Sequence, residues 1–267
     1  MLTSKTIEQI RKRLDVMTAW RYATVCEVPL EAAETMEHFR QPPDELPYKE
    51  APIDSTWGVH WGTVWFRGEI EIPRELRGQR VYYRNRHDGE RLLFVNGQPF
   101  AGMDPYHQEV LLTPKARGGE QYRLHLEAYC GHPMHMVDAF DPKPITMHGI
   151  SGASLEPPPL PLRESAIVVE REVVAGFLYD AEVLYRTALM LDENALRRAH
   201  ILELLSSILD QISLQWKEEH ELTAMMTGAR KQLAPLLKLK NGPSAPTVGI
   251  VGHAHIDVGW LWPDRKS

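Results

Sequence analysis

The chain has 267 residues, of which 43% are hydrophobic and 25% are charged; this composition is typical of a globular protein and excludes a disordered or fibrous chain. The net charge of -6, with both signs interspersed, excludes a nucleic-acid partner because phosphate backbones require basic patches. No stretch approaches the roughly 20 apolar residues of a membrane span and no apolar signal segment follows the first residues, so we expect a cytoplasmic protein without a membrane partner.

Two helices are predicted at the start of the chain. Four apolar residues recur at the spacing of one helix face: Ile7, Ile10, Leu14 and Met17. They predict an amphipathic helix from about Ser4 to Trp20, and a second, short helix is predicted over Pro29 to His38. We therefore assign residues 1–40 to an N-terminal helical segment.

A β-rich region follows at residues 41–155. Aromatic and β-branched residues occur there in short runs, separated by Gly, Pro, Asn or Asp. Asn96-Gly97 predicts a type I′ hairpin, because that turn needs positive φ at both central residues. Short strands at this spacing are typical of a β-sandwich or jelly roll. The predicted strands are Val64–Ile72, Val81–Arg86, Arg91–Val95, Gln98–Ala101, Glu109–Leu112 and Gln121–Tyr129.

A second helical region is predicted after a proline-rich linker. The linker is residues 156–163, EPPPLPLR, which favour polyproline geometry and indicate a domain boundary. Apolar residues then recur at the spacing of a helix buried on one face: Ile201, Leu204, Leu205, Ile208, Leu209 and Ile212. Residues 164–246 are predicted to form helices, with Asp192 as an N-cap. The helices are expected over Glu164–Leu191, Glu193–Gln215 and Lys217–Leu239.

The last segment, residues 247–267, predicts the start of a further domain. Thr247 to Val251 is a short apolar run rich in β-branched residues, as in a buried parallel strand. The expected fold class is therefore α+β. It comprises a helix and a jelly-roll-like β-sandwich, then a helical segment and the first strand of a truncated α/β barrel.

A dense chemical motif, GHAHIDVGWLWP, follows that strand at residues 252–263. An extended backbone places His253, His255 and Asp257 on one face at the C-terminal end of the strand, where α/β barrels bind ligands. Imidazole and carboxylate together suit zinc. Trp260, next to these groups, offers a ring on which a sugar could stack. The alternative is that the histidines are only hydrogen-bonded near a strand end.

The motif resembles the opening of the catalytic domain in α-mannosidases of glycoside hydrolase family 38. Weaker similarity to the cytosolic and bacterial branch continues upstream, in WGTVWFRG at residues 61–68 and FVNG at residues 94–97. The resemblance implies a retaining glycosidase in which zinc holds hydroxyls of a terminal mannose. It also implies that His255 and Asp257 bind zinc, that Trp260 lines the mannose subsite, and that His253 orients a ligand or closes the pocket.

The catalytic carboxyl groups are expected elsewhere. Retaining hydrolysis needs two carboxyl groups about 5 to 5.5 Å apart, one as nucleophile and one as acid and base. In the family that the motif resembles, both follow the motif, so we expect them beyond Ser267 and expect the isolated chain to be inactive. Two zinc ligands also predict only weak zinc binding, because zinc sites take three or four protein ligands.

Two other functions stay open. An amidohydrolase-type metallohydrolase would use both His253 and His255 as ligands. A non-catalytic module would bind carbohydrate or mediate homo-oligomer contacts. The GWLW that follows the motif favours the mannosidase, whose partner would be a mannose-containing oligosaccharide. The loop around His132 to Met136 is assigned no chemistry, and the tryptophans at 57, 61 and 65 are predicted to pack in the sheet.

Overall fold

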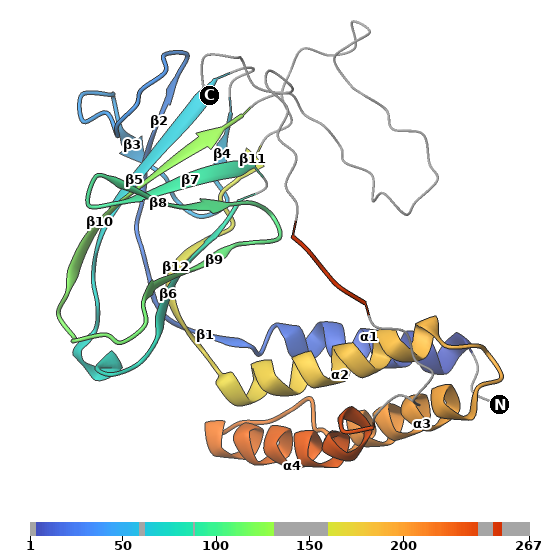
Figure 1. The fold of residues 1–267 in the computed structure, drawn as a ribbon. Coiled ribbons are helices and arrows are strands. Elements are labelled where there is room, and N and C mark those ends of the chain that lie inside the picture. Colours follow the sequence, from blue (N-terminus) through green and yellow to red (C-terminus); the bar gives the residue numbers. More distant parts are fainter. Residues whose placement is uncertain (1–3, 59–61, 88, 131–159, 240–247, 253–267) are drawn as a thin grey trace, which may run out of the picture. The chain divides into compact units, whose positions relative to one another are not determined.

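The computed structural model describes residues 4–58, 62–87, 89–130, 160–239 and 248–252 (Figure 1). The described residues fall into two compact units. One comprises residues up to Ala23 together with those from Glu170 to Gly252, and the other comprises Thr24 to Val169. The first is helical and the second is a β-sandwich, so the sandwich is inserted in the sequence between the first helix and the others.

The described residues of the helical unit form four helices around one apolar core. Helix α1 (Ser4–Thr18) confirms the helix predicted at the start of the chain, and its Ile10, Leu14 and Met17 are buried as the spacing requires. These side chains join a cluster with Phe177, Leu205 and other buried residues of the remaining helices. Those helices are α2 (Glu172–Met190), α3 (Leu196–Gln211) and α4 (Glu219–Leu237).

The N-terminus of α2 is fixed by Arg171. The Arg171 guanidinium donates hydrogen bonds to the carbonyl oxygens of Trp20 and Tyr22, at 2.8 and 3.2 Å. It also pairs with the Glu219 carboxylate at 2.9 Å and lies over the Trp216 ring at 5.4 Å. One side chain therefore ties the chain after α1 to the start of α4, within the helical unit.

Two sequence predictions about these helices were wrong. The helix expected from Glu164 begins only at Glu172, because residues 164–170 pair as a strand. Asp192 does not cap α3: the N-cap is Ala195, and the Asp192 carboxylate accepts the backbone N–H of Asn194 instead. Asp forms such local turns as readily as it caps helices, so the residue type alone does not distinguish a turn from an N-cap.

The sandwich consists of two antiparallel sheets and a two-stranded pair, and it confirms the predicted jelly-roll-like fold. The four-stranded sheet has the order β1 (Tyr22–Glu27), β12 (Glu164–Glu170), β6 (Val81–Arg86), β9 (Glu109–Thr113). The six-stranded sheet has the order β3 (Lys49–Glu50), β2 (Glu31–Thr35), β5 (Thr63–Glu71), β10 (Gln121–Tyr129), β7 (Glu90–Val95), β8 (Gln98–Met103). The pair is β4 (Thr56–Trp57) with β11 (Leu160–Pro161).

The core of the sandwich follows the two-residue period of its strands. Val64, Phe66 and Ile70 of β5 are buried in the same apolar cluster as Leu124 and Leu126 of β10. Arg67 and Glu69, between them in sequence, belong to the opposite face of the six-stranded sheet. The alternation thus separates an apolar inner face from an outer face that carries charged side chains.

The helix predicted over Pro29 to His38 is the strand β2 instead. Ala33 of β2 pairs opposite Trp65 of β5, and Ala32 opposite Phe66. Both alanines are buried, so small side chains stand where large aromatic ones need room. Tertiary packing overrides the helical preference of this alanine-containing segment.

The predicted linker and hairpin have different outcomes. Leu160 and Pro161 of the proline-rich segment form β11, and the Leu162 side chain is fully buried in the sandwich core, so the described end of that segment belongs to the sandwich. The hairpin is confirmed, because Asn96 and Gly97 have φ of 51° and 77°. The Asn96 side chain also accepts the backbone N–H of Arg123 on β10 at 2.9 Å.

The strand expected at Thr247 to Val251 is not formed among the described residues 248–252. Val248, Ile250 and Val251 are exposed there, and no described strand pairs with them. Among the described residues, no helix is long and apolar enough to cross a membrane. Cys26 and Cys130 are both free thiols.

Candidate functional site

The candidate site residues of the predicted zinc motif lie outside the described residues. This holds for His253, His255, Asp257 and Trp260, and also for the loop at 132–136 and for Trp61. In the described ranges, no group of three or more His, Cys, Asp or Glu side chains is placed to hold a metal ion. The metal site expected from the sequence therefore stays a prediction.

The two described tryptophans of the 57–65 segment pack as predicted. Trp65 is fully buried and lies 5.6 Å from the Phe94 ring, between ring centroids. Trp57 is half-buried and meets Phe66 edge-on at 5.5 Å. Neither ring is an open platform on which a ligand could stack.

A cleft of about 1050 Å³ opens on the sandwich, between residues 27–31, residues 50–53 and the strand β5. A second cleft of about 670 Å³ shares four of its lining residues: Asp44, Glu69, Arg123 and His125. We call the two together the His125 trough. Its size is that of clefts that bind small molecules.

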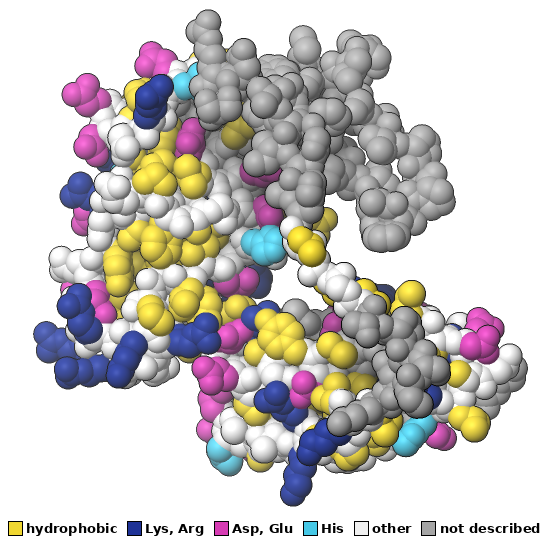
Figure 2. Space-filling view, in the orientation of Figure 1, with side chains coloured by type: hydrophobic (Ala, Val, Ile, Leu, Met, Phe, Trp, Pro, Cys, Tyr) yellow, Lys and Arg dark blue, Asp and Glu magenta, His cyan; other side chains and the backbone are white. Residues whose placement is uncertain are grey.

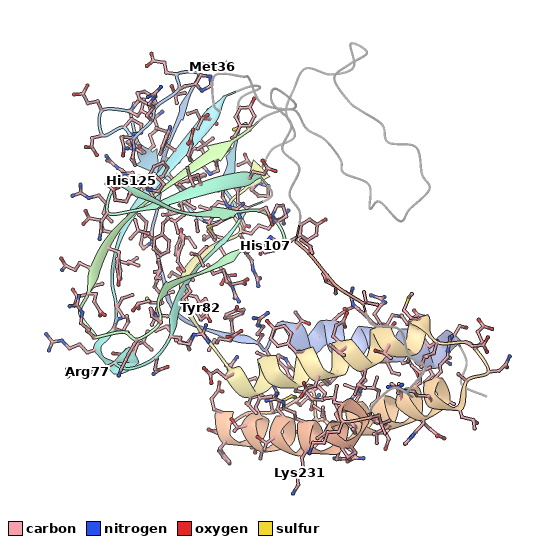
Figure 3. All side chains as sticks on the ribbon, in the orientation of Figure 1. Met36, Arg77, Tyr82, His107, His125 and Lys231 are labelled. Atoms are coloured by element: carbon pink, nitrogen blue, oxygen red, sulfur yellow. The ribbon has the colours of Figure 1, made fainter. Side chains whose placement is uncertain are left out.

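His125 lies on β10, a central strand of the six-stranded sheet (Figure 3). It pairs opposite Arg67 of β5 and Phe94 of β7. The His125 side chain is only 3% exposed, and its Nδ1 atom has no hydrogen-bond partner. Burial lowers the pKa of the His125 imidazole, and the nearby Arg123 and Arg67 guanidinium groups lower it further, against an opposing effect of Asp44. The imidazole is therefore neutral at pH 7.

Two ion pairs flank His125. The Arg67 guanidinium pairs with the Glu31 carboxylate at 2.7 Å, and Arg123 pairs with Glu69 at 3.3 Å. Arg67 also lies 4.0 Å from the centroid of the Tyr48 ring. Cations and carboxylates thus alternate along this part of the trough.

Tyr48 holds the loop before β3 in place. Its hydroxyl donates a hydrogen bond to the Pro43 carbonyl oxygen at 2.9 Å, next to Asp44 of the trough. Burial raises the pKa of Tyr48 to about 12, so the hydroxyl stays protonated and keeps donating. The Tyr48 ring therefore fixes both Arg67 and the backbone that carries Asp44.

The wall opposite the charged strands is partly apolar. Pro29, Pro52 and Ile53 are exposed and line the larger cleft. Gly68 of β5 permits this close approach, because a Cβ atom there would meet the Pro29 carbonyl oxygen at 2.7 Å and the Leu30 Cδ2 atom at 2.8 Å. The cleft therefore combines an apolar wall with a charged one.

A basic end of the sandwich, around Arg77, is a separate surface feature (Figures 2 and 3). It carries exposed cations on two adjacent loops: Arg74, Arg77, Arg80, Lys115 and Arg117. The same loops carry Glu75 and Glu120, and Glu120 accepts the backbone N–H of Arg117. These cations do not line either cleft of the His125 trough, and we take the trough as the better-formed site.

Two antiparallel sheets that share one apolar core define a jelly-roll sandwich, a fold that serves many unrelated functions. The family model described as "Alpha-mannosidase, jelly roll domain" matches residues 17–155, just over half of the chain. The chain belongs to this family of α-mannosidase jelly-roll domains.

Curated relatives agree with this membership. The chain is similar to alpha-mannosidase 2C1 of Mus musculus, with 24% identity over 242 residues, which are 84% of this chain and 21% of that protein. It is also similar to alpha-mannosidase G of Dictyostelium discoideum, with 22% identity over 233 residues, covering 84% of this chain and 20% of the relative. The chain therefore spans about a fifth of the length of the curated relatives it matches.

A distant likeness to a solved structure is also found. Faecalibacterium prausnitzii beta-glucuronidase has a TM-score of 0.39 and 14% identity, over 57% of this chain and 32% of that chain. This likeness says nothing about function, because a shared fold at that distance does not carry a site.

Sequence reasoning did not find the His125 trough. Arg123 and His125 alternate along a predicted strand, which indicates that they share a face, but their partners Glu31, Asp44 and Arg67 come from distant segments. A site assembled across three strands and a loop has no local motif. Only the pairing of β2, β5 and β10 brings these residues together.

Proposed function

We propose that the chain is the N-terminal part of a zinc-dependent, retaining α-mannosidase that hydrolyses terminal α-mannosyl residues of oligosaccharides. The observation that carries the proposal is the match of residues 17–155 to the α-mannosidase jelly-roll family. The named relatives, which are α-mannosidases, support it. In this proposal the sandwich is a non-catalytic domain that precedes the catalytic one.

The residues proposed to act are those of the motif at 252–263. His255 and Asp257 would supply an imidazole nitrogen and a carboxylate oxygen, a donor pair that fits zinc. Zinc bound there would act as a Lewis acid toward sugar hydroxyl groups. Trp260 would stack on the apolar face of the mannose ring, and His253 would orient a ligand. The remaining zinc ligands and both catalytic carboxyl groups would come from outside these 267 residues.

Zinc binding tests the proposed ligands. We expect calorimetric titration of the chain with zinc to show weak binding, and His255→Ala or Asp257→Ala to weaken it about tenfold or more. His107→Ala is the matched control, because His107 is an exposed histidine on a sandwich turn. Equal zinc affinity in the three variants would contradict the ligand assignment.

Hydrolysis of an aryl α-mannoside tests the activity. We expect no turnover by the 267-residue chain with or without zinc, beside turnover by a full-length relative as the positive control. In that relative, alanine at the residues aligned with His255 and Asp257 should abolish turnover. Zinc-dependent turnover by the short chain would show that the catalytic carboxyl groups lie within it, and a full-length relative that tolerates both changes would refute the assignment.

The same zinc titration distinguishes the amidohydrolase alternative from the mannosidase proposal. If His253 is a ligand, as that alternative requires, His253→Ala weakens zinc binding as much as His255→Ala does. The mannosidase proposal expects the smaller effect for His253→Ala, since this residue would only orient a ligand.

A further inference from the structure

We propose that the His125 trough is a binding site for a neutral oligosaccharide, on the sandwich and apart from the zinc motif. The proposal uses no residue of the motif, so it stands or falls independently of the proposed catalytic function. It assigns a ligand class to a site that the family match does not describe.

The first argument is the unsatisfied imidazole of His125. A buried polar atom without a hydrogen-bond partner is costly, and such atoms are rare in folded proteins. Nδ1 of His125 is such an atom, in a side chain that lines both clefts of the trough. Nδ1 is closed to solvent, so a ligand hydroxyl group would bond it once the imidazole turns toward the cleft, and a hydroxyl can then donate or accept whichever tautomer the ring adopts.

The second argument is the charge around His125. The two ion pairs, Arg67 with Glu31 and Arg123 with Glu69, balance each other beside a neutral imidazole. An anionic group would face the carboxylates that outnumber the cations along the larger cleft, where Glu27, Asp44 and Glu50 form no ion pair with any described residue. The hydroxyl groups of a neutral ligand suit this lining, because a hydroxyl donates to carboxylates and accepts from guanidinium groups.

The third argument is the pattern of donors and acceptors. Adjacent sugar hydroxyl groups both donate and accept, so a pair of them can bridge a carboxylate and a guanidinium of one ion pair. The trough offers two such pairs on neighbouring strands, and the exposed Pro29, Pro52 and Ile53 provide an apolar wall for a ring face. A metal ion lacks a ligand set in the described residues of the trough.

The size of the trough favours more than one sugar ring. The two clefts measure about 1050 and 670 Å³ and are joined at His125 and Arg123. A drug-sized molecule occupies clefts of about 300 to 1000 Å³, so the joined clefts can hold a short oligosaccharide. Tyr48 holds the loop that carries Asp44 through its hydrogen bond to Pro43 and its ring contact with Arg67.

Ligand-observed NMR on the full 267-residue chain tests the proposal, with α-linked mannotriose and a second neutral trisaccharide as probes. We expect saturation transfer to at least one of them at millimolar concentration. Arg123→Gln and Glu69→Gln, which are exposed on the sheet and leave the core intact, should each weaken binding about tenfold, since hydrogen bonds to charged groups are the stronger ones. Arg117→Gln is the matched control, because it changes an exposed arginine away from the trough.

His125 itself is tested in two ways. His125→Gln keeps a polar side chain, and circular dichroism shows whether the variant still folds. In the unsubstituted chain, the ¹H–¹³C resonance of the His125 ring should shift when the sugar binds, and that of His107 should not. Loss of binding in His125→Gln with a retained fold supports the proposal.

Three outcomes would overturn it. The first is that neither neutral sugar binds. The second is sugar binding that is unchanged by Arg123→Gln and Glu69→Gln. The third is that a sulfated oligosaccharide or an oligolysine peptide competes for the trough more strongly than the neutral sugars, which would show that charge, and not hydroxyl recognition, selects its ligand.

Discussion

Replacing Gly68 by alanine should destabilise the sandwich, because the new methyl group has no room. Its Cβ would lie 2.7 Å from the Pro29 carbonyl oxygen and 2.8 Å from Leu30 Cδ2. Ordinary carbon contacts are about 3.5 to 4.0 Å, so the segment before β2 must move away from β5 by most of an ångström. Overpacking of this kind costs about 1 to 3 kcal/mol, and the lower backbone entropy of alanine returns about 0.4 to 1 kcal/mol.

The net loss of about 1 to 2 kcal/mol should lower the melting temperature by roughly 2 to 8 °C. Gly102→Ala on β8 is the control, because no atom lies within 4 Å of the Cβ position there. Thermal unfolding, with hydrogen exchange of peptides from β5 and β10, assigns the loss to the sandwich and not to the helical unit. Equal melting temperatures and equal exchange in the two variants would refute the packing argument.

Two further perturbations test buried contacts. Tyr83 is fully buried beside Ser165, and burial raises its pKa to about 12. Because tyrosine ionises near pH 10 in the unfolded chain, the free energy of unfolding should fall between pH 10 and 12 by up to about 1.4 kcal/mol per pH unit. Urea titrations should show a smaller fall in Tyr83→Phe but an unchanged fall in Tyr106→Phe, whose side chain is exposed. Arg171→Met removes the hydrogen bonds that fix the start of α2 and should lower the free energy of unfolding of the helical unit by about 2 kcal/mol in denaturant titrations. Arg186→Met removes an exposed ion pair on α2 and should change that free energy by less than about 0.5 kcal/mol. Equal effects of the two substitutions would show that the Arg171 hydrogen bonds contribute nothing.

The sequence predicted the strands of the sandwich well, because each has local causes. Val81–Arg86 and Gln121–Tyr129 were predicted with their observed bounds. The first opens with Val-Tyr-Tyr, apolar and polar residues alternate along the second from Tyr122 to Ala128, and turn residues flank both. Asn96-Gly97 likewise determines its own turn geometry. Local propensity and tertiary packing agree in these segments.

Prediction from the sequence was wrong where pairing between distant segments determines the secondary structure. Glu164–Glu170 precedes a helix and follows a proline-rich segment, which favours a linker and then a helix. The strand forms because it pairs with β6 and buries Ala166, Ile167 and Val168, with Ile167 in the sandwich core. In the same way, the residues around His125 could not be predicted, because only the order of strands in the sheet brings Glu31 and Arg67 close to it.

The insertion of the sandwich after α1 has a consequence during protein synthesis. More than 150 residues separate the end of α1 at Thr18 from the start of α2 at Glu172. At about 5 to 20 residues per second, α1 leaves the ribosome roughly 8 to 30 s before the first helix it packs against. Its apolar face, with Ile10, Leu14 and Met17, has none of its helical partners in that interval. The nascent chain of this protein therefore has to keep this apolar segment from associating with other chains while the sandwich is still being made.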